Sequence, residues 1–455
     1  MSTDANKKEV IYFIGIGGIG MSALARYFKF HGNQVSGYDK TATVLTKQLE
    51  AEGIEVHYEE NLELIPKQPD VIVYTPAIPA AHKELQYYKE QGFQLLKRSE
   101  VLGYITNKAF NICVAGTHGK TTTTTMVAHI LRDSEYGCNA FLGGIAANYN
   151  SNYWSNERNV CVVEADEYDR SFLKLSPDIA IITAMDPDHL DIYGTPEAME
   201  ESFIEFSSKL KKDGLLISKY GLKRGAELKG PHHWTYHRED SRADVYSKNR
   251  TLEQGGYRFD VVINGTEITD IYLPMGGLHN VENVTAAIAV AHFLGITDEK
   301  IRVAVSSFKG VKRRFEYIIR TEELVVVDDY AHHPEELHAL ISSAKNLFPD
   351  YTCTVLFQPH LFTRTRDFID GFASVLSEAD ETVLLPIYPA RELPIEGVTS
   401  DWLLSKLTNK QHFLLEKNAA VEWVKKNKKE KQLIIIAGAG DIDTLVLPIK
   451  EALEA

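Results

Sequence analysis

The sequence predicts an α/β protein of three domains, each built around a mainly parallel β-sheet. Strand-like apolar runs alternate with helical runs along most of the 455 residues, which is the pattern of sheets whose faces are covered by helices. Two glycine-rich turns each follow a strand and precede a helix, as in folds that bind ligands at the ends of parallel strands. At roughly 100–200 residues per domain, we expect the chain to divide into residues 1–107, 108–310 and 311–455.

The first domain is predicted to be Rossmann-like, because its opening strand leads into a glycine fingerprint. The strand Val10–Ile14 precedes Gly15-Ile-Gly-Gly-Ile-Gly20, which fits G-x-G-x-x-G before a helix that begins near Met21. Glycines there let the backbone approach a diphosphate, which the N–H groups and dipole of the helix N-terminus favour. Asp39 follows the strand Gln34–Tyr38, near the position of a ribose-binding acid. A dinucleotide is the obvious ligand, a nucleoside-diphosphate sugar presents the same diphosphate, and the alternative is a turn that serves packing alone.

The central domain is predicted to be a P-loop-type nucleotide-binding domain. The strand Asn111–Ala115 leads into Gly116-Thr-His-Gly-Lys-Thr-Thr122, which opens a helix. Backbone N–H groups of such a turn cradle the phosphates of ATP, while Lys120 can neutralise them and the Thr121 hydroxyl can bind Mg²⁺. The ordinary P-loop expression fails here, because Val114 stands where its first glycine belongs. The alternative is a fortuitous Gly-Lys-Thr turn, which the strand–turn–helix context argues against.

Acidic residues follow the next two predicted strands of the central domain. Glu164 ends one strand and Asp166 and Glu167 follow it, so a carboxylate there would face the phosphate loop and could hold Mg²⁺. His189 lies between acidic neighbours after the strand Asp178–Ala184. A histidine between acids is more often a surface residue, but its place near the other strand ends makes it a candidate second metal ligand.

The character of the chain changes from about His232 to Met275, where polar and β-prone residues alternate and Asn264-Gly265 is a strong hairpin signal. We therefore expect antiparallel strands added to the parallel central sheet. After Lys309, strands and helices alternate again, which predicts a second Rossmann-like, doubly wound domain. Its expected elements are strands over 324–328, 353–357, 381–385 and 432–437, and a helix over 334–347.

Composition excludes two classes of partner. The formal net charge is −14 and the pI is about 5.6, so neither nucleic acid nor an anionic membrane surface would attract the protein. No stretch is long and apolar enough to span a bilayer. Four glycines interrupt the apolar run Val10–Ala25, which argues against a signal peptide, and the four cysteines lack zinc-binding spacing. We expect a cytoplasmic protein with reduced cysteines and no membrane insertion, as a monomer or a weak dimer.

Two nucleotide-type turns in consecutive domains narrow the class of function. A dehydrogenase would use the first turn and leave Gly116–Thr122 idle, and a simple ATPase would leave the first turn idle. A non-catalytic nucleotide sensor, which binds its ligand without turnover, would not need Lys120, Glu164 and His189 together. A ligase that uses ATP on a nucleotide-linked substrate explains both turns.

Taken in order, the motifs of this chain resemble those of the Mur ligase family over nearly the whole length. The matching segments are Gly116–Thr122, Glu164–Glu167, Asp188–Asp191, Gly277–Asn283, Val311–Glu316 and Asp328–Pro334. The resemblance implies a ligase that phosphorylates a carboxylate with ATP and lets an amine displace the phosphate. It also implies ATP and two Mg²⁺ ions as cofactors, with metal ligands at Thr121, Glu164 and His189.

The family resemblance also implies the roles of site residues. ATP would contact Gly116, Thr117, His118, Gly119, Lys120, Thr121, Thr122, Asn280, Asn283, Arg314 and Asp329. The UDP-sugar would contact Gly15, Gly17, Gly18, Gly20, Met21, Ser22, Asp39, Thr75 and Arg98. The amino acid would contact Tyr330, His332, Arg364 and Arg366. The catalytic set would be Lys120, Glu164, His189, Arg314 and His332. His332 would deprotonate or orient the amine. The alternative for His332, and for Asn280 and Asn283, is that the side chain only caps a helix.

Within the family, the chain resembles the branch that adds L-alanine to UDP-N-acetylmuramate, the first peptide step of peptidoglycan synthesis. The full glycine fingerprint over 15–20 and the segment Gln358–Asp367 carry this likeness. The alternative is the recycling branch, which adds a whole tripeptide to the same sugar nucleotide. The chain departs from the branch at Leu361, where arginine is common, and at Tyr168 and Arg170, where smaller residues are common.

Overall fold

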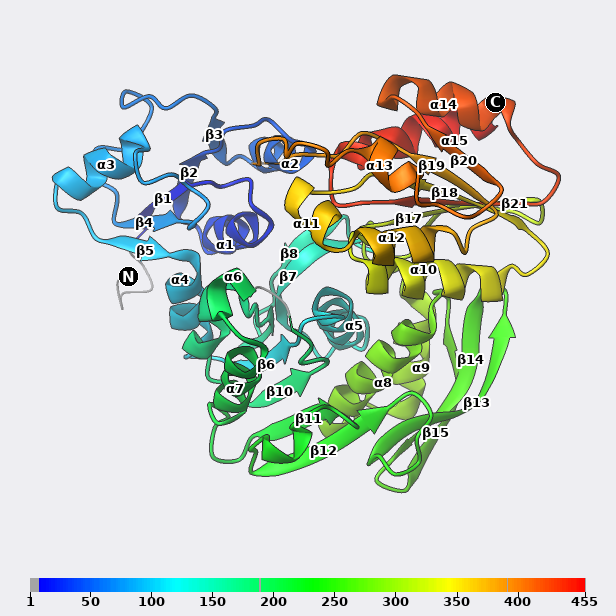
Figure 1. The fold of residues 1–455 in the computed structure, drawn as a ribbon. Helices are drawn as coiled ribbons and strands as arrows, with labels where there is room; N and C mark the ends of the chain where they lie inside the picture. The colour runs from blue at the N-terminus through cyan, green and yellow to red at the C-terminus, as the bar shows by residue number, and fades with distance from the viewer. Residues whose placement is uncertain (1–7, 188–189, 391, 455) are drawn as a thin grey trace. The chain divides into compact units, whose positions relative to one another are not determined.

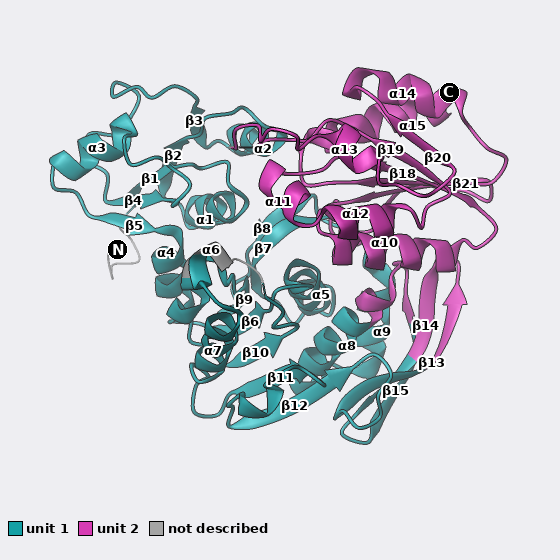
Figure 2. Ribbon diagram, viewed as in Figure 1, with its two compact units in different colours: residues 1–248, 260–271, 282–308 teal, residues 249–259, 272–281, 309–455 magenta. Residues whose placement is uncertain are grey.

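Three β-sheets organise the chain, and each contains parallel strands where the sequence predicts them (Figure 1). The computed structural model describes residues 8–187, 190–390 and 392–454. The chain forms two units: the first holds residues 1–248, 260–271 and 282–308, and the second holds residues 249–259, 272–281 and 309–455 (Figure 2). The predicted α/β fold class is confirmed, while the domain boundaries near residues 107 and 310 stay predictions.

The first sheet has five parallel strands in the order β3-β2-β1-β4-β5. Its strands are β1 (Val10–Ile14), β2 (Gln34–Tyr38), β3 (Glu55–His57), β4 (Val71–Tyr74) and β5 (Leu95–Lys97). Its helices are α1 (Ile19–Phe30), α2 (Val44–Ala51), α3 (Lys83–Glu90) and α4 (Arg98–Thr106). Because β2 and β4 flank β1 on opposite sides, the turns after β1 and β4 meet at the carboxyl edge, where such sheets bind ligands.

The second sheet has ten strands in the order β15-β14-β13-β12-β11-β10-β6-β9-β7-β8. Its strands are β6 (Phe110–Ala115), β7 (Asn139–Ala146), β8 (Ser151–Trp154), β9 (Val160–Glu164), β10 (Ile179–Ile182), β11 (Leu215–Lys219), β12 (His232–His237), β13 (Val245–Glu253), β14 (Gly256–Ile263) and β15 (Thr266–Leu273). Its helical segments are α5 (Lys120–Asp133), η1 (Tyr168–Lys174), α6 (Leu190–Tyr193), α7 (Pro196–Ser207), η2 (Gly225–Glu227), α8 (Leu278–Phe293) and α9 (Asp298–Ser307). Since β9, β6 and β10 are parallel neighbours, the turn after β6 and the acids after β9 lie at one edge.

The antiparallel part of this sheet is smaller than predicted. The prediction is wrong for β12, which pairs parallel with both β11 and β13. Alternating polarity reports one buried and one exposed face, and it does not report strand direction, which explains the error. The hairpin signal is confirmed, because Asn264 and Gly265 join β14 to β15 with φ of 47° and 84°, as a two-residue type I′ turn requires.

The third sheet has six strands in the order β16-β17-β21-β18-β19-β20 and is parallel except where β16 pairs antiparallel with β17. Its strands are β16 (Glu316–Arg320), β17 (Leu324–Asp329), β18 (Thr352–Phe357), β19 (Glu381–Leu384), β20 (Gln411–Leu414) and β21 (Gln432–Ala437). Its helical segments are α10 (Pro334–Leu347), α11 (Phe362–Asp367), α12 (Ile369–Leu376), α13 (Ser400–Leu404), α14 (Lys417–Lys426), η3 (Asp441–Leu445) and α15 (Val446–Glu454). The sequence pattern does not single out β16 and β20, because these short edge strands have few fully buried residues.

The cysteines and the apolar segments have ordinary surroundings. The four cysteines are buried and free, which agrees with the expectation of reduced thiols. Burial raises the pKa of Cys161 to about 12, so this thiol is a poor nucleophile. Within the described ranges, no helix combines the length and the apolar character that crossing a membrane requires.

Helix α5 begins with Lys120, and five threonines follow it, which are poor helix formers because they are β-branched. The Oγ1 groups of Thr124 and Thr125 each donate to the carbonyl oxygen four residues earlier, both at 2.7 Å. Thr123 is fully buried, and its hydroxyl has no hydrogen-bond partner within the described part of the chain. A buried hydroxyl without a partner destabilises a fold by about 1–3 kcal/mol.

We predict that Thr123→Val stabilises the protein, because valine keeps the shape of the side chain and removes the unpartnered hydroxyl. A gain of about 1 kcal/mol should raise the midpoint of thermal unfolding by about 1–2 °C in a chain of this size. Thr125→Val is the matched control, because it removes a hydroxyl that does donate, and it should leave the midpoint unchanged or lower it. Scanning calorimetry measures both, and a lower midpoint for Thr123→Val would show that the hydroxyl is satisfied in solution.

Candidate active site

The glycine turn of the first domain is held by the end of the neighbouring strand. Gly15 and Ile16 both donate their backbone N–H groups to Tyr38 O, at 2.8 and 2.9 Å. Gly17 N donates to Asp39 Oδ2 at 2.8 Å, so the carboxylate predicted to bind a ribose fixes the turn in this structure. A Cβ on Gly17 would lie 2.8 Å from that same oxygen, so a larger residue would displace the carboxylate.

Thr75 and Arg98 lie against the same turn. A Cβ on Gly15 would lie 2.7 Å from Thr75 Cγ2, and one on Gly20 would lie 2.9 Å from Arg98 Cδ. Arg98 Nη2 also donates to Asp166 Oδ2 at 3.2 Å, which ties α4 to the end of β9. The structure therefore brings these predicted UDP-sugar residues together at the carboxyl edge of the first sheet.

Met21 and Ser22, which were predicted to contact the same ligand, have side chains inside the fold. Met21 is 2% exposed and belongs to the hydrophobic core. Ser22 is fully buried, and its hydroxyl donates to Ile19 O at 2.9 Å. These two side chains therefore help to hold α1 in place, and Met21 also lies beside the turn, because a Cβ on Gly18 would lie 3.6 Å from Met21 Cγ.

The turn between β6 and α5 is pinned to the end of β10. Gly116 has a φ of 134°, and a Cβ there would lie 2.1 Å from Thr183 Oγ1. Thr117 N donates to Ala184 O at 3.2 Å, and Thr183 Oγ1 donates to His118 O. Only glycine fits position 116, because the end of β10 occupies the space where any side chain would begin.

The last glycine of this turn lies beside helix α8. Gly119 has a φ of 79°, and a Cβ there would lie 2.8 Å from Asn283 Oδ1. Because α8 begins at Leu278, Asn283 lies inside the helix, and the N-cap alternative does not apply to it. Asn280 is also inside the helix, and in the second unit its Nδ2 donates to Gly276 O at 2.7 Å.

Lys120 forms a buried ion pair. Its Nζ donates to Glu167 Oε1 at 2.7 Å and to Gly116 O at 2.6 Å. Burial lowers the pKa of Lys120, but the Glu167 and Glu164 carboxylates outweigh it and hold the pKa above its usual value. Glu167 is 1% exposed, and burial raises its pKa although Lys120 opposes the rise. Lys120 therefore carries a positive charge at neutral pH beside the turn.

Two oxygen groups converge at the start of α5. Thr121 Oγ1 donates to Glu164 Oε1 at 3.0 Å, and Gly143 N donates to Glu164 Oε2 at 3.0 Å. A hydroxyl and a carboxylate at this distance are the kind of ligands that Mg²⁺ prefers, so this donor set fits the metal. The next residue, Thr122, is buried. The remaining predicted metal ligand, His189, lies outside the described residues.

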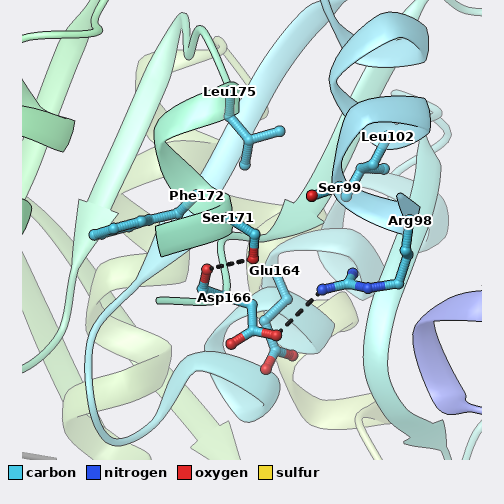
Figure 3. A pocket seen from close by; sticks show the side chains of 8 residues that line it. All are labelled: Arg98, Ser99, Leu102, Glu164, Asp166, Ser171, Phe172 and Leu175. Atoms are coloured by element: carbon cyan, nitrogen blue, oxygen red, sulfur yellow. Dashed lines mark hydrogen bonds and ion pairs between the residues drawn. The ribbon is translucent and has the colours of Figure 1, made fainter. Parts of the chain in front are cut away.

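A small pocket of about 210 Å³ opens between α4, the end of β9 and η1 (Figure 3). Its lining residues are Arg98, Ser99, Leu102, Glu164, Asp166, Ser171, Phe172 and Leu175. Polar side chains gather on one side, where Arg98 reaches the Asp166 carboxylate and Ser171 Oγ donates to Asp166 O at 3.1 Å (Figure 3). The leucines and the phenylalanine form the apolar side (Figure 3). The pocket therefore joins the arginine beside the glycine turn to the carboxylate beside the P-loop.

The predicted residues of the third domain form a cluster of their own in the second unit. Asp329 accepts a backbone N–H group at each carboxylate oxygen, at 2.6 and 2.7 Å. The guanidinium groups of Arg313 and Arg314 lie over the Tyr330 ring, at 5.2 and 5.3 Å from its centroid. Burial raises the pKa of Asp329 to about 6, although Arg314 opposes the rise.

His332 has the features of a neutral base. Its Nδ1 lies 2.9 Å from Tyr330 O. A carbonyl oxygen only accepts, so this contact assigns the proton to Nδ1 and leaves the lone pair on Nε2. Burial lowers the pKa of His332, so the ring is neutral at pH 7. The capping alternative applies to the next residue, because His333 is the N-cap of α10 and its side chain accepts from Glu335 N.

The two arginines predicted to bind the amino acid occupy different places on α11. Arg364 lies close enough to His332 for its charge to add to the effect of burial in lowering the pKa of the histidine. Arg366 is half exposed and pairs with Asp367 at 2.7 Å. The structure thus brings Arg364, and not Arg366, to the His332 cluster. Leu361 precedes the helix with φ of 70° and ψ of 135°, a strained conformation for a residue other than glycine.

Sequence reasoning places Glu167 among the carboxylates near the phosphate loop but does not predict its pairing with Lys120, and it misses Gly143 altogether. Glu167 pairs with Lys120, and its signal was its place in the acidic cluster three residues beyond Glu164. Gly143 donates to Glu164, and the sequence holds no signal for it, because the contact depends on how β7 pairs with β9.

Together these features define a class of protein: an α/β protein with two glycine turns of the kind that bind phosphates, and with a hydroxyl and a carboxylate beside one of them that suit a divalent cation. Three family models match the chain, namely the Mur ligase catalytic domain over residues 10–109, the Mur ligase middle domain over 114–291 and the Mur ligase glutamate ligase domain over 313–440. The chain belongs to the Mur ligase family.

Relatives within the family match over nearly their full length. The chain is 48% identical over 453 residues to a UDP-N-acetylmuramate–L-alanine ligase from Flavobacterium johnsoniae, with 98% of each chain covered. It is also 48% identical to a relative of the same name from Porphyromonas gingivalis, covering 98% of this chain and 99% of the relative. Among solved structures, UDP-N-acetylmuramate–alanine ligase from Thermotoga maritima is similar with a TM-score of 0.84 at 29% identity, covering 98% of this chain and 99% of that one. A murein peptide ligase from Psychrobacter arcticus, at 22% identity and a TM-score of 0.71, shares the fold over 98% of both chains.

Asp328 is a buried carboxylate beside the Tyr330 cluster. It is 2% exposed, its Oδ2 lies 3.6 Å from Arg313 Nε, and its Oδ1 has no hydrogen-bond partner among the residues that the structure describes. Burial raises its pKa from 3.8 to about 7, although Arg313 opposes the rise. The folded state therefore binds the proton more tightly than the unfolded state. The resulting stabilisation is complete below about pH 4 and is lost as the pH rises through about 7.

We predict that the midpoint of thermal unfolding falls as the pH rises from about 5.5 to about 8 and that Asp328→Asn flattens this dependence. At pH 8 the variant should melt at a higher temperature than the original protein, because it lacks the buried charge. Asp443→Asn is the matched control, since Asp443 lies 3.7 Å from the same Arg313 but is half exposed. Calorimetry across this pH range is the measurement, and equal slopes for both proteins would exclude Asp328 as the titrating group.

Proposed function

We propose that the protein is an ATP-dependent ligase that joins L-alanine to the carboxylate of UDP-N-acetylmuramate. The observation that carries the proposal is the link between the two glycine turns: Arg98 packs on Gly20 of one turn and shares a pocket with Glu164, which accepts from Thr121 of the other. A ligase needs both turns, whereas a dehydrogenase and an ATPase each leave one without a ligand. The names of the Flavobacterium johnsoniae and Porphyromonas gingivalis relatives support L-alanine as the amine.

The proposal assigns each of the three substrates to one of the predicted sites. UDP-N-acetylmuramate would bind the glycine turn, with its diphosphate toward the N-terminus of α1 and with Asp39, Thr75 and Arg98 around it. ATP would bind the turn Gly116–Thr122, and the amino acid would bind the His332 cluster. The reaction would be the first peptide step of peptidoglycan synthesis, which we place in the cytoplasm.

The chemistry requires an activated carboxylate, because a free carboxylate has no good leaving group. A carboxylate oxygen takes the γ-phosphoryl group of ATP, and the amine nitrogen then attacks the carbonyl carbon and expels phosphate. Phosphoryl transfer depends on positioning and charge neutralisation, which the fixed ammonium of Lys120 would supply. Thr121 and Glu164 would hold Mg²⁺, which adds further neutralisation when bound, and the proposed second ion would need His189.

The His332 cluster has the groups that an amino-acid substrate needs. The amine must lose a proton before it can attack, and the Nε2 lone pair of His332 is a suitable acceptor because burial lowers the pKa of this ring. Arg364 would pair with the carboxylate of the amino acid. Contacts of Asn280, Arg314 and Asp329 with ATP remain predictions.

We predict that phosphate release from ATP depends on both UDP-N-acetylmuramate and L-alanine. The assay contains the protein, ATP, Mg²⁺ and UDP-N-acetylmuramate, with either L-alanine or the L-alanyl tripeptide, and it quantifies phosphate and the amide product. A parallel assay adds a nicotinamide cofactor and follows its absorbance. The proposal would be supported if phosphate and the amide product form in equal amounts with L-alanine and neither forms with the tripeptide. Release with the tripeptide only would move the chain to the recycling activity. Oxidation or reduction of a nicotinamide cofactor without phosphate release would refute ligation altogether.

We predict that Lys120→Ala lowers the rate of ligation about 100-fold or more, because the ammonium beside the phosphate-binding turn is lost. Calorimetric binding of UDP-N-acetylmuramate should persist, since the glycine turn does not contact Lys120. Lys209→Ala is the matched control, because Lys209 pairs with Glu205 in a partly exposed, i,i+4 contact and should be dispensable. Normal turnover in Lys120→Ala would show that the ATP site is assigned wrongly.

A further inference from the structure

One asparagine of the central sheet bonds the helix that follows the glycine turn. Asn152 lies on β8 and is fully buried. Its Nδ2 donates to Ile19 O at 2.5 Å and to Ser22 Oγ at 3.0 Å, and its Oδ1 accepts from Arg26 Nη1. Residues at this spacing share one face of a helix, so a single side chain contacts two turns of α1.

The end of α1 that Asn152 bonds is the end that carries the glycine turn. Ile19 is the first residue of α1, and the N-cap residue before it is Gly18, which has no side chain to cap the helix. Ser22 Oγ donates to the same Ile19 O, at 2.9 Å. Arg26 extends the contact, because its Nε and Nη2 bind the two carboxylate oxygens of Glu52, both at 2.7 Å. The start of α1 is therefore fixed by a residue from another sheet.

The hairpin of β7 and β8 connects Asn152 to the proposed metal site. Gly143 on β7 donates its N–H to Glu164 Oε2 at 3.0 Å. Phe141 on β7 pairs with the residue after Asn152 on β8 and with the residue before Glu164 on β9. Only two strand pairings thus separate the asparagine that holds α1 from the carboxylate that bonds the P-loop.

Apolar packing alone would hold α1 less specifically. Tyr27 on α1 packs against Phe141 and Tyr153 of the hairpin, with ring centroids 5.6 and 6.3 Å apart. Apolar contacts are non-directional and tolerate small displacements. Hydrogen bonds need both distance and direction, so the Asn152 amide can define the position of the helix along its axis.

We propose that Asn152 is a positioning residue for ligation. It holds the glycine-turn helix in register with the P-loop, so that the carboxylate of the bound sugar nucleotide meets the phosphoryl group. The inference rests on the proposed function, because it assigns the sugar nucleotide to the glycine turn. A displacement of about 1 Å slows an enzymatic step on the order of 100-fold. Loss of these buried bonds should therefore affect the chemical step more than the binding of either substrate.

Two substitutions at position 152 separate positioning from packing. Asn152→Asp keeps the volume and an acceptor for Arg26, but its carboxylate cannot donate to Ile19 O. Asn152→Ala removes all three hydrogen bonds, those to Ile19, Ser22 and Arg26. The matched control is Asn148→Ala: Asn148 lies in the turn of the same hairpin, and its Nδ2 donates to Ser307 O at 2.7 Å, away from α1.

The experiment uses the full chain with Mg²⁺ and measures kcat at saturating substrates. Calorimetry gives the affinity and stoichiometry of binding for UDP-N-acetylmuramate and for a non-hydrolysable ATP analogue. We expect both Asn152 variants to lose about 10- to 100-fold in kcat, with unchanged stoichiometry and nearly unchanged affinities. Asn148→Ala should keep its kcat.

The outcomes separate the inference from the function on which it rests. A normal kcat in Asn152→Asp, or an equal loss in Asn148→Ala, would overturn the positioning role while leaving the ligase assignment intact. A loss of binding stoichiometry that matches the loss of kcat would show a merely structural role and would also overturn it. If the unsubstituted protein performs no ligation, the proposed function fails, and the positioning role fails with it.

Discussion

A polyanionic ligand can bind this protein only where local groups overcome the field of a chain with a formal net charge of −14. In the first unit Lys120 is one such group: its side chain is 13% exposed, and its ammonium pairs with Glu167 at 2.7 Å. A buried ammonium without a partner would give up its proton or leave the interior. Glu167 therefore keeps the charge in place, and phosphate oxygens can replace the carboxylate as its partner.

The rest of the phosphate site is backbone, which explains where glycines are required. At Gly116 the end of β10 occupies the Cβ position, and at Gly119 the Asn283 amide does so. At Gly17 the Asp39 carboxylate occupies it and bonds the N–H of the same residue. Each turn is thus formed by close contact with a neighbouring element, and one basic side chain lies beside each, Arg98 at the first turn and Lys120 at the second.

Local features of the site could be predicted from the sequence, and long-range contacts could not. A strand, a glycine turn and a helix follow one another within about 20 residues, so both glycine turns were predicted together with the elements that flank them. The direction of β12 and the bond from Gly143 to Glu164 depend on strand pairing, which no local pattern records. The sequence also could not tell which of two adjacent histidines caps α10. The structure gives that role to His333, and His332 keeps the geometry of a base.

The second unit pairs buried charges in the same way as the first. Asp328 lies beside Arg313, and the charge of Arg314 opposes the rise in the pKa of Asp329. In both units a cationic side chain lies beside a buried carboxylate, so the two opposite charges largely cancel within each cluster. An arriving anion would take the place of the carboxylate beside the cation, and its added negative charge would have to be balanced at the displaced carboxylate. An acidic protein can in this way bind anionic substrates, provided that the displaced carboxylate is taken up by a proton or a metal ion. Glu164 and Glu167 stand close enough to the P-loop for such an exchange, because one bonds Thr121 and the other bonds Lys120.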